Sequence, residues 1–285
     1  MFTTKPHPRQ ATLVFLSIGL LACSAGCGNA GEPAQGPPAT PAAARYEGIS
    51  ATRPTGSADI SPDGLVVAFD METLTADGNL RDFSGNGHHG ALTGNDVVEG
   101  AFRGARRFDD IADRVHLDEH PDLDLDGPHT IAVWVRVDQL GLHQHLFACD
   151  DKWALWITPD DQFRLGDTHG GGWSMTEGSV AAGRWTSVVS VLRGTRGDPL
   201  TPEAAALYVD GELADAGMHL RTDEARDLGT WNPGDLYPSD ACYVGFESHQ
   251  GNEAHQSMPF VGALDEVLLF SRAWTEDEVR AFSRR

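Results

Sequence analysis

The stretch Asp82-Phe83-Ser84-Gly85-Asn86-Gly87-His88-His89-Gly90 decides between two fold classes. Its glycines, its serine and its asparagine are typical of a tight turn with backbone positions at positive φ. The spacing Gly85-x-Gly87-x-x-Gly90 also matches the fingerprint of dinucleotide-binding βαβ units. That fingerprint requires a helix to open at its last glycine, whereas the following residues, 91–96, are broken again by Gly94 and Asn95. The stretch is therefore predicted to be a loop between β-strands.

Outward from this loop, the chain consists of short apolar segments separated by Gly, Asp, Asn and Pro. The clearest segment is residues 129–137, in which Ile131, Val133, Val135 and Val137 alternate with Ala132, Trp134 and Arg136. Alternation with a period of two indicates a strand with two different faces. Further strands are predicted at residues 65–69, 105–108, 114–117, 145–149, 153–157, 184–192, 205–209, 212–214, 241–246 and 261–270.

One helix is predicted, close to the C-terminus. Thr275 followed three residues later by Glu278 is a capping box, which opens a helix from Glu276 to about Ser283. Many short strands with a single terminal helix favour an all-β, two-sheet antiparallel sandwich. Residues 59–285 are long enough to bury one substantial core, and we expect them to form one domain.

The N-terminus has the pattern of an export signal. Lys5 and Arg9 precede an apolar run that is too short to span a bilayer, and residues 1–22 are predicted to be a signal peptide. The run ends in Leu20-Leu21-Ala22-Cys23, which resembles a bacterial lipobox and predicts lipidation of Cys23. Cys27 is the competing position, and an ordinary secretory signal is the alternative. Residues 23–58 are rich in Pro, Ala and Gly and are predicted to be a disordered tether.

The formal net charge of −21 at pH 7 excludes one class of partner and favours another. A chain this acidic repels nucleic acids and other polyanions, while divalent cations are natural ligands for it. We expect an exported protein at the cell envelope, in contact with the membrane only through its N-terminal lipid.

Cys149 and Cys242 are the cysteines of the main domain. An oxidising compartment allows them to pair, and a Cys149–Cys242 disulfide is predicted. The alternative is two separate buried thiols.

Six motifs occur in the order found in the laminin-G-like, concanavalin-A-like jellyroll family, which this chain resembles from Leu65 to the C-terminus. They are Asp82-x-Ser-Gly-Asn-Gly-x-x-Gly90, Gly104-Ala-Arg-Arg-Phe108 with Val115-x-Leu117, Thr130-Ile-Ala-Val-Trp-Val135, Trp185-Thr-Ser-Val188, Leu207-Tyr-Val-Asp-Gly211, and Phe260-x-Gly-x-Leu-Asp-Glu-Val267. The resemblance implies a jellyroll sandwich. This chain departs from the family pattern by two insertions, which lengthen the loops between Leu192 and Ala205 and between Leu213 and Ala241.

The resemblance also implies a structural calcium ion where the glycine-rich loop meets the last strand. Calcium takes six to eight oxygen ligands. The predicted ligands are Asp82 and Asn86 from the loop, Asp265 from the last strand, and Asp70 at the end of the first strand. The alternative is that Asp82 and Ser84 form an Asx-type turn without a metal.

Two kinds of catalytic or metal chemistry find weak support. The glucanase branch of the resembling family carries a Glu-x-Asp-x-x-Glu strand that this chain lacks, and adjacent Asp265 and Glu266 are expected on opposite faces of a strand. His143 and His145 share a strand face, but they supply only two of the four ligands of a structural zinc site.

Aromatic residues in loops favour a binding function instead. Trp173, Trp231 and Tyr237 lie in Gly- and Pro-rich stretches, where they either stack on sugar rings or pin the loops to the sandwich. We expect a non-catalytic module that recognises an extracellular glycan or protein. A carbohydrate-active enzyme and a purely structural surface protein are the alternatives.

Overall fold

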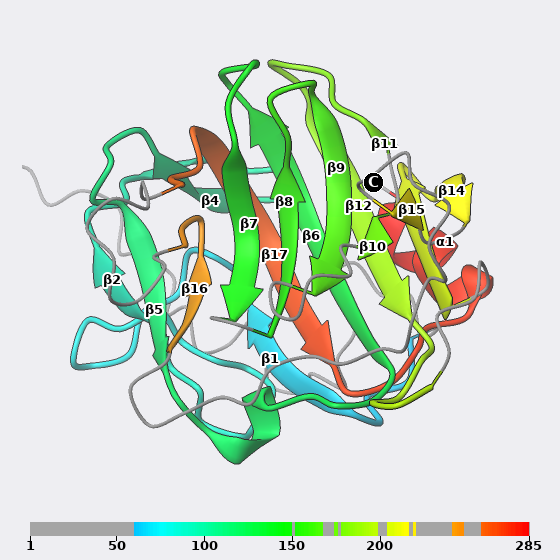
Figure 1. The fold of residues 1–285 in the computed structure, drawn as a ribbon. Helices are drawn as coiled ribbons and strands as arrows, with labels where there is room; N and C mark the ends of the chain where they lie inside the picture. Colours follow the sequence, from blue (N-terminus) through cyan, green and yellow to red (C-terminus); the bar gives the residue numbers. More distant parts are fainter. Residues whose placement is uncertain are drawn as a thin grey trace, which may run out of the picture. The chain divides into compact units, whose positions relative to one another are not determined.

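The computed structural model (Figure 1) describes residues 60–149, 152–167, 174–175, 178–198, 204–216, 219–220, 241–247 and 258–284. The predicted signal peptide and tether, with Cys23, lie outside these residues, as do Trp173, Trp231 and Tyr237. Within them, no helix has the length and the hydrophobicity needed to cross a membrane.

The first sheet has the strand order β14-β13-β12-β6-β17-β4-β3, and β1 also pairs with β17. Its strands are β1 (Leu65–Phe69), β3 (Val97–Glu99), β4 (Gly104–Phe108), β6 (His129–Val137), β12 (Trp185–Leu192), β13 (Ala205–Val209), β14 (Glu212–Ala216) and β17 (Gly262–Phe270). Every pairing in it is antiparallel.

The second sheet has the order β11-β9-β8-β7-β16-β5-β2 and is also antiparallel. Its strands are β2 (Ala91–Thr93), β5 (Arg114–Asp118), β7 (Gln144–Cys149), β8 (Trp153–Ile157), β9 (Gln162–Asp167), β11 (Gly178–Ser179) and β16 (Ala241–Val244). A separate two-stranded pair is formed by β10 (Ser174–Met175) and β15 (His219–Leu220).

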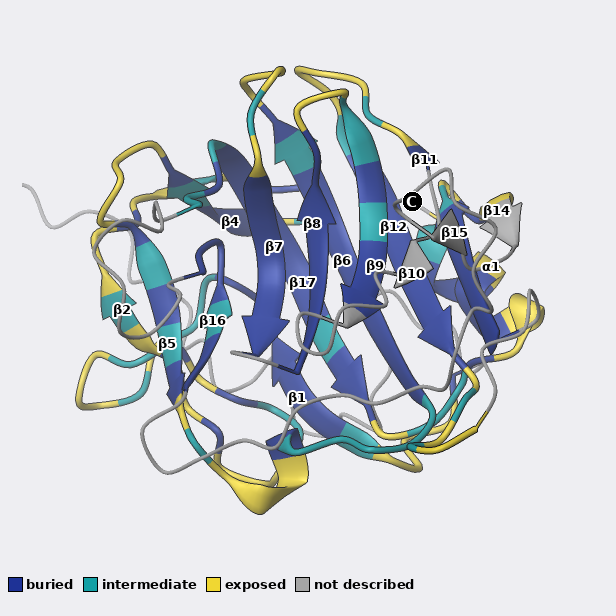
Figure 2. Ribbon diagram, in the orientation of Figure 1, coloured by how far each residue is buried: buried dark blue, intermediate teal, exposed yellow. Residues whose placement is uncertain are grey.

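The main core lies between the two sheets. Residues 131, 133, 135 and 137 of β6 contribute to it, together with Trp153, Leu155 and Ile157 of β8. The alternate residues Ala132 and Trp134 of β6 belong to a different cluster on the opposite face. The period-two prediction for this segment is therefore confirmed, and Figure 2 shows the central strands as buried along most of their length.

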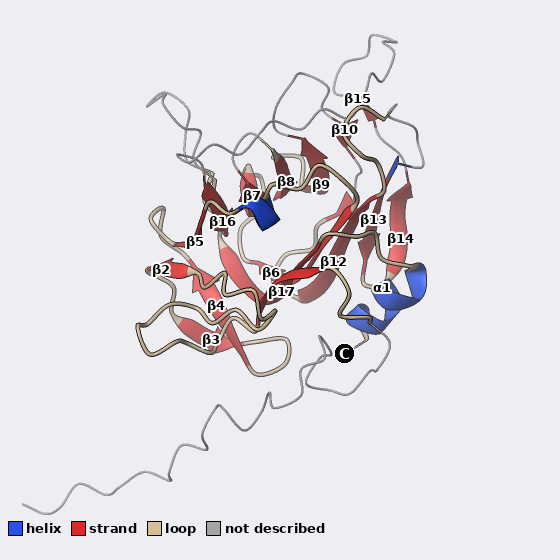
Figure 3. Cartoon of the chain, turned by 90° about the horizontal axis from the view of Figure 1, so that it is seen from below, coloured by secondary structure: helices blue, strands red, loops and turns tan. Residues whose placement is uncertain are grey.

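The outer face of the first sheet is covered by helix α1 (Glu276–Ser283). Trp134, Trp274 and Phe282 pack together there, and Figure 3 shows α1 beside this sheet. The predicted capping box is present: Thr275 accepts the backbone N–H of Glu278, and the Glu278 carboxylate accepts the N–H of Thr275. The all-β sandwich with one short C-terminal helix is thus confirmed.

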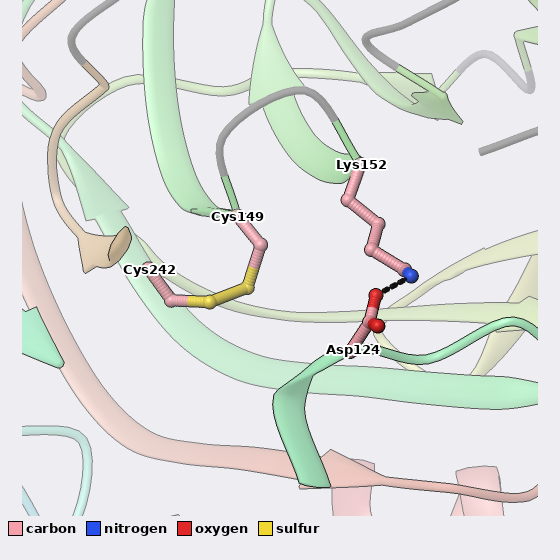
Figure 4. The surroundings of a disulfide bond; sticks show 4 residues. All are labelled: Asp124, Cys149, Lys152 and Cys242. Atoms are coloured by element: carbon pink, nitrogen blue, oxygen red, sulfur yellow. Dashed lines mark hydrogen bonds and ion pairs between the residues drawn. A yellow bond between two sulfur atoms is a disulfide. The ribbon is translucent and has the colours of Figure 1, made fainter. Parts of the chain in front are cut away.

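The predicted disulfide joins Cys149 of β7 to Cys242 of β16, which face each other in the strand register. Close to it, the fully buried ammonium group of Lys152 forms an ion pair with Asp124 (Figure 4) and a second one with Asp126 at 2.9 Å. A buried ammonium group needs such partners, because desolvation of an unpaired charge is costly.

Candidate functional site

The Asp82 carboxylate organises the glycine-rich loop. Its Oδ1 accepts backbone N–H groups from Ala68 at 3.0 Å and Ser84 at 2.9 Å. Its Oδ2 accepts the Ser84 hydroxyl at 2.6 Å and the backbone N–H groups of Gly87 and His88 at 3.1 and 3.0 Å. A carboxylate offers about four lone-pair sites, so these five donors occupy Asp82 and give it the role of an anchor for the loop.

Asn86 ties the same loop to the first strand. Its amide nitrogen donates to the carbonyl oxygens of Leu65 and Val66, both at 2.9 Å. The backbone N–H of Ala68 donates to the Asp82 carboxylate, and its carbonyl oxygen accepts the backbone N–H of Phe83. The loop therefore lies along the edge of β1 that faces away from β17.

This arrangement divides the four predicted calcium ligands between two places. Asp82 and Asn86 hold the loop on one edge of β1, whereas Asp70 and Asp265 meet on the side of β17 and line the same small cavity. We call it the acidic cavity; its lining residues are Asp70, Glu72, Phe102, Arg103, Gly104, Asp265 and Glu266. The expectation that the glycine-rich loop meets Asp265 is corrected by this geometry.

A β-bulge creates the acidic cavity. On one edge of β17, β4 pairs with residues 262–264 and β1 pairs with residues 267–270, so the two strands follow each other end to end. The register of β17 against β6 shifts between Asp265 and Leu268, and Glu266 has a left-handed φ of 49°. A bulge interrupts the regular alternation of side chains. The regular alternation on which the opposite-face prediction for Asp265 and Glu266 rested is therefore interrupted here, and both residues line the cavity.

Burial raises the pKa of Asp265 to about 7, and the nearby Asp70 carboxylate contributes to the rise. Hydrogen bonds from backbone N–H groups partly oppose it, including one from Phe102 to Oδ2 at 3.1 Å. Positive charge is also near, because the buried Arg106 guanidinium interacts with Asp70. An oxygen-lined cavity with a desolvated carboxylate has the chemistry of a site for a hard divalent cation.

The carboxylates of this cavity are candidate calcium ligands, but among the described residues no three of them bring one oxygen atom each within 4.8 Å of the other two. The cavity of about 10 Å³ holds roughly one water-sized sphere. A Cβ on Gly100 would lie 2.6 Å from Oδ2 of Asp265, and one on Gly104 would lie 2.7 Å from Oε2 of Glu72. The absence of side chains at these two glycines is what lets the carboxylates approach the backbone here. The candidate ligands are Asp70, Glu72, Asp265 and Glu266.

A second candidate site lies on the outer face of the second sheet. His145 of β7 pairs with Trp156 of β8, which pairs with Arg164 of β9. Directly paired residues project from the same face, so these three, which we call the transverse row, lie side by side across three strands. The rings of His145 and Trp156 are stacked, with their centroids 6.0 Å apart. Trp156 is buried on this outer face together with Ala148 and Ala154.

The transverse row reaches solvent through His143. The exposed His143 ring stacks on buried His145 at 5.1 Å, and their Nε2 atoms are 3.3 Å apart. Buried Glu247 forms a 2.7 Å ion pair with Nε2 of His145. Sequence reasoning found the histidine pair but missed Glu247, which the pairing of β16 with β7 brings near from a distant part of the chain.

Two stacked antiparallel sheets, with a polar and aromatic row across one outer face, define a lectin-like jellyroll domain. The model of the concanavalin A-like lectin/glucanases superfamily matches residues 109–280, and the chain belongs to this superfamily. A search of curated proteins found no match.

Solved structures show the same fold at low sequence identity. Domain 4 of AbnA, a GH43 extracellular arabinanase from Geobacillus stearothermophilus in complex with arabinotriose, is 17% identical with a TM-score of 0.51. The alignment covers 77% of this chain and 98% of that domain. The binding domain of Paraclostridial Mosquitocidal Protein 1 is 17% identical with a TM-score of 0.53, over 78% of this chain and 52% of that one. A Trypanosoma rangeli sialidase in complex with sialic acid is 14% identical with a TM-score of 0.54, over 80% of this chain and 34% of that one.

This chain thus spans nearly all of the arabinanase domain, about half of the toxin binding domain and about a third of the sialidase. The fold is shared by binding domains and by chains with glycosidase activity.

Proposed function

We propose that this domain is a non-catalytic recognition module that binds an extracellular glycan at the transverse row. The observation that carries the proposal is the register of His145, Trp156 and Arg164 across three neighbouring strands. Because strands are about 4.8 Å apart, the row extends over roughly 10 Å, which suits an oligosaccharide rather than a single small ion.

The exposure of each side chain gives it a role. Trp156 is 2% exposed and His145 is 3% exposed, so they support the site from beneath. His143 is exposed, and Arg164 keeps 14% of its side chain accessible, so these two make the ligand contacts. Imidazole and guanidinium groups donate hydrogen bonds to sugar hydroxyls. The strongly acidic chain favours a neutral glycan over a sulfated one.

The relatives support this choice of ligand. The arabinanase domain is described in complex with arabinotriose, and another structure with this fold concerns botulinum neurotoxin type C, whose cell entry depends on two ganglioside molecules. Both ligands carry sugars, which supports a glycan as the class of ligand.

We further propose that calcium occupies the acidic cavity and stabilises the domain, and that the chain is exported and anchored by a lipid at Cys23. The Cys149–Cys242 disulfide supports export, since disulfides persist in oxidising compartments. Labelling cells with a radioactive fatty acid tests the anchor. The label should be lost in Cys23→Ser and kept in Cys27→Ser; the reverse pattern would move the anchor to Cys27.

A glycan array, probed with and without calcium, tests the recognition function. Wild-type protein should bind a neutral glycan, and His143→Ala and Arg164→Ala should each weaken binding at least about tenfold, as the loss of a hydrogen bond to a ligand predicts. Arg184→Ala is the matched control, because this half-exposed arginine pairs with Asp210 on the first sheet. Unchanged binding in both row variants would overturn the proposed site.

The buried His145–Glu247 pair keeps an enzyme as the second candidate. A carboxylate held 2.7 Å from an imidazole is an arrangement used in acid–base catalysis. If the wild-type protein degrades an array glycan and Glu247→Gln abolishes this activity without lowering the Tm, the enzyme replaces the recognition module.

A further inference from the structure

Three side chains outside both candidate sites converge between the glycine-rich loop and the segment after β5. His88 belongs to the glycine-rich loop, and His120 and Asp122 belong to the short 3-10 turn Pro121–Leu123 and its N-cap, just after β5. One ligand atom from each residue lies within 4.8 Å of the other two, and among the described residues this is the group of His, Cys, Asp and Glu that meets that condition.

The Asp122 carboxylate lies between the two imidazole rings. Its Oδ2 is 3.4 Å from Nε2 of His88 and 3.4 Å from Nδ1 of His120. The two rings meet edge to face, with their centroids 4.6 Å apart. In a tetrahedral zinc site with metal–ligand distances of about 2.0–2.1 Å, neighbouring ligand atoms are about 3.3 Å apart. The two distances from Oδ2 of Asp122 are therefore close to the ligand spacing of a metal centre, and the two histidine nitrogens lie within 4.8 Å of each other.

His88 supplies an independent indication of a ligand. This side chain is 6% exposed, and its buried Nε2 makes no hydrogen bond to any described residue. A buried polar atom without a hydrogen bond is destabilising, because its lost contact with water is not replaced. The backbone N–H of His88 is held by Asp82, so the loop presents the ring in a fixed position. A metal ion on Nε2 would satisfy this atom.

His120 is also arranged as a ligand. Its Nδ1 accepts the backbone N–H of Asp122 at 3.2 Å, so a metal ion bound at this atom would have to take the place of that hydrogen bond. A cation between Nδ1 and the Asp122 carboxylate would replace this long hydrogen bond with a stronger contact.

We propose that His88, His120 and Asp122 form a zinc-binding site with an open coordination position. Imidazole nitrogens select zinc and similar transition metals, whereas calcium prefers an all-oxygen set. Three protein ligands leave the fourth tetrahedral position to water or to an oxygen atom of a ligand. The metal would join the glycine-rich loop to the segment after β5. This site shares no residue with the acidic cavity or the transverse row.

Calorimetric titration of metal-stripped full-length protein with zinc chloride, in excess calcium, tests the site. We expect saturable binding of about one zinc ion per chain at this site. His120→Ala and Asp122→Asn should each lower the zinc affinity at least about 100-fold. Removing even a group that only hydrogen-bonds to a metal ligand lowers metal affinity about 10–100-fold, and these two variants remove ligands themselves. Both side chains are about half exposed, so the variants should fold. The control is His116→Ala, which removes a partly exposed histidine of β5 that lies outside the cluster.

Cobalt substitution provides a second readout. Tetrahedral cobalt in wild-type protein should give strong visible absorption bands, and Asp122→Asn should lose them while its Tm without metal stays within a few degrees of wild type. Zinc binding that both variants retain at wild-type affinity would assign the metal to another part of the chain and overturn the proposal. Absence of saturable binding in the wild-type protein would also overturn it.

Discussion

Cys149 and Cys242 lie directly opposite each other on β7 and β16, and their disulfide closes a loop between residues 93 positions apart in the sequence. The bond fixes the pairing of two strands that belong to distant parts of the chain. Because β16 also places Glu247 beside His145, the same pairing supports the proposed binding face.

Removing the disulfide should lower the free energy of unfolding. A cross-link over a loop of this length stabilises a domain by about 3–5 kcal/mol, mainly through the unfolded state. We expect a Cys149→Ala, Cys242→Ala double variant to show this loss in urea unfolding monitored by tryptophan fluorescence. Chemically reduced wild-type protein should match it, and a double variant as stable as the oxidised protein would contradict the prediction.

Calcium should stabilise the wild-type domain through Asp265. At a concentration about 100 times Kd, a bound ion adds about 2.7 kcal/mol, which corresponds to a rise in Tm of roughly 5–10 °C for a domain of this size. In the Asp265→Asn variant, the Tm measured in calcium should equal the Tm measured in chelator.

Asp82→Asn is the matched control for this experiment. It should lower the Tm equally with and without calcium, because its new amide group would face backbone donors that now bond to the carboxylate. Wild-type protein that melts at the same temperature in calcium and chelator would rule out calcium in the acidic cavity.

His129 should make the domain sensitive to mild acid. Burial lowers its pKa from 6.5 to about 4, although the Gly127 carbonyl, 3.1 Å from Nδ1, opposes the shift. Since the folded-state pKa is the lower one, its contribution to stability is complete above pH 6.5 and is lost as the pH falls toward 4. When the pH is lowered from 7.5 to 5.0, the free energy of unfolding of the wild-type protein should fall by about 2 kcal/mol more than that of the His129→Gln variant. Equal losses in urea titrations at the two pH values would show that His129 does not titrate in this way.

Two glycines with positive φ should tolerate alanine very differently. Gly85 has a φ of 93° and no neighbouring atom within 4 Å of a Cβ, so Gly85→Ala should cost only about 1 kcal/mol of backbone strain. Gly245 has a φ of 76°, and its Cβ would lie 2.2 Å from the buried Phe108 ring. Gly245→Ala should cost more than about 3 kcal/mol, since overpacking adds to the strain. Thermal unfolding of both variants checks the order, and a Gly85 variant that is the less stable one would contradict it.

The sequence alone determined the fold class and most element positions, because these depend on local periodicity. The alternation in β6 and the capping box of α1 lie within a few residues, and both appear in the structure where they were expected. The very short strands β2 and β3 were not predicted, since three residues are too few to display a period of two.

Only the tertiary structure decided which side chains meet. Asp70 joins Asp265 rather than Asp82 because β1 and β4 share one edge of β17 and a left-handed Glu266 turns the last strand at that point. His88 meets Asp122 because the loop anchored by Asp82 and the turn after β5 fold toward each other. Such contacts depend on strand pairing between distant segments and on a single bulge, and neither leaves a periodic signal in the sequence.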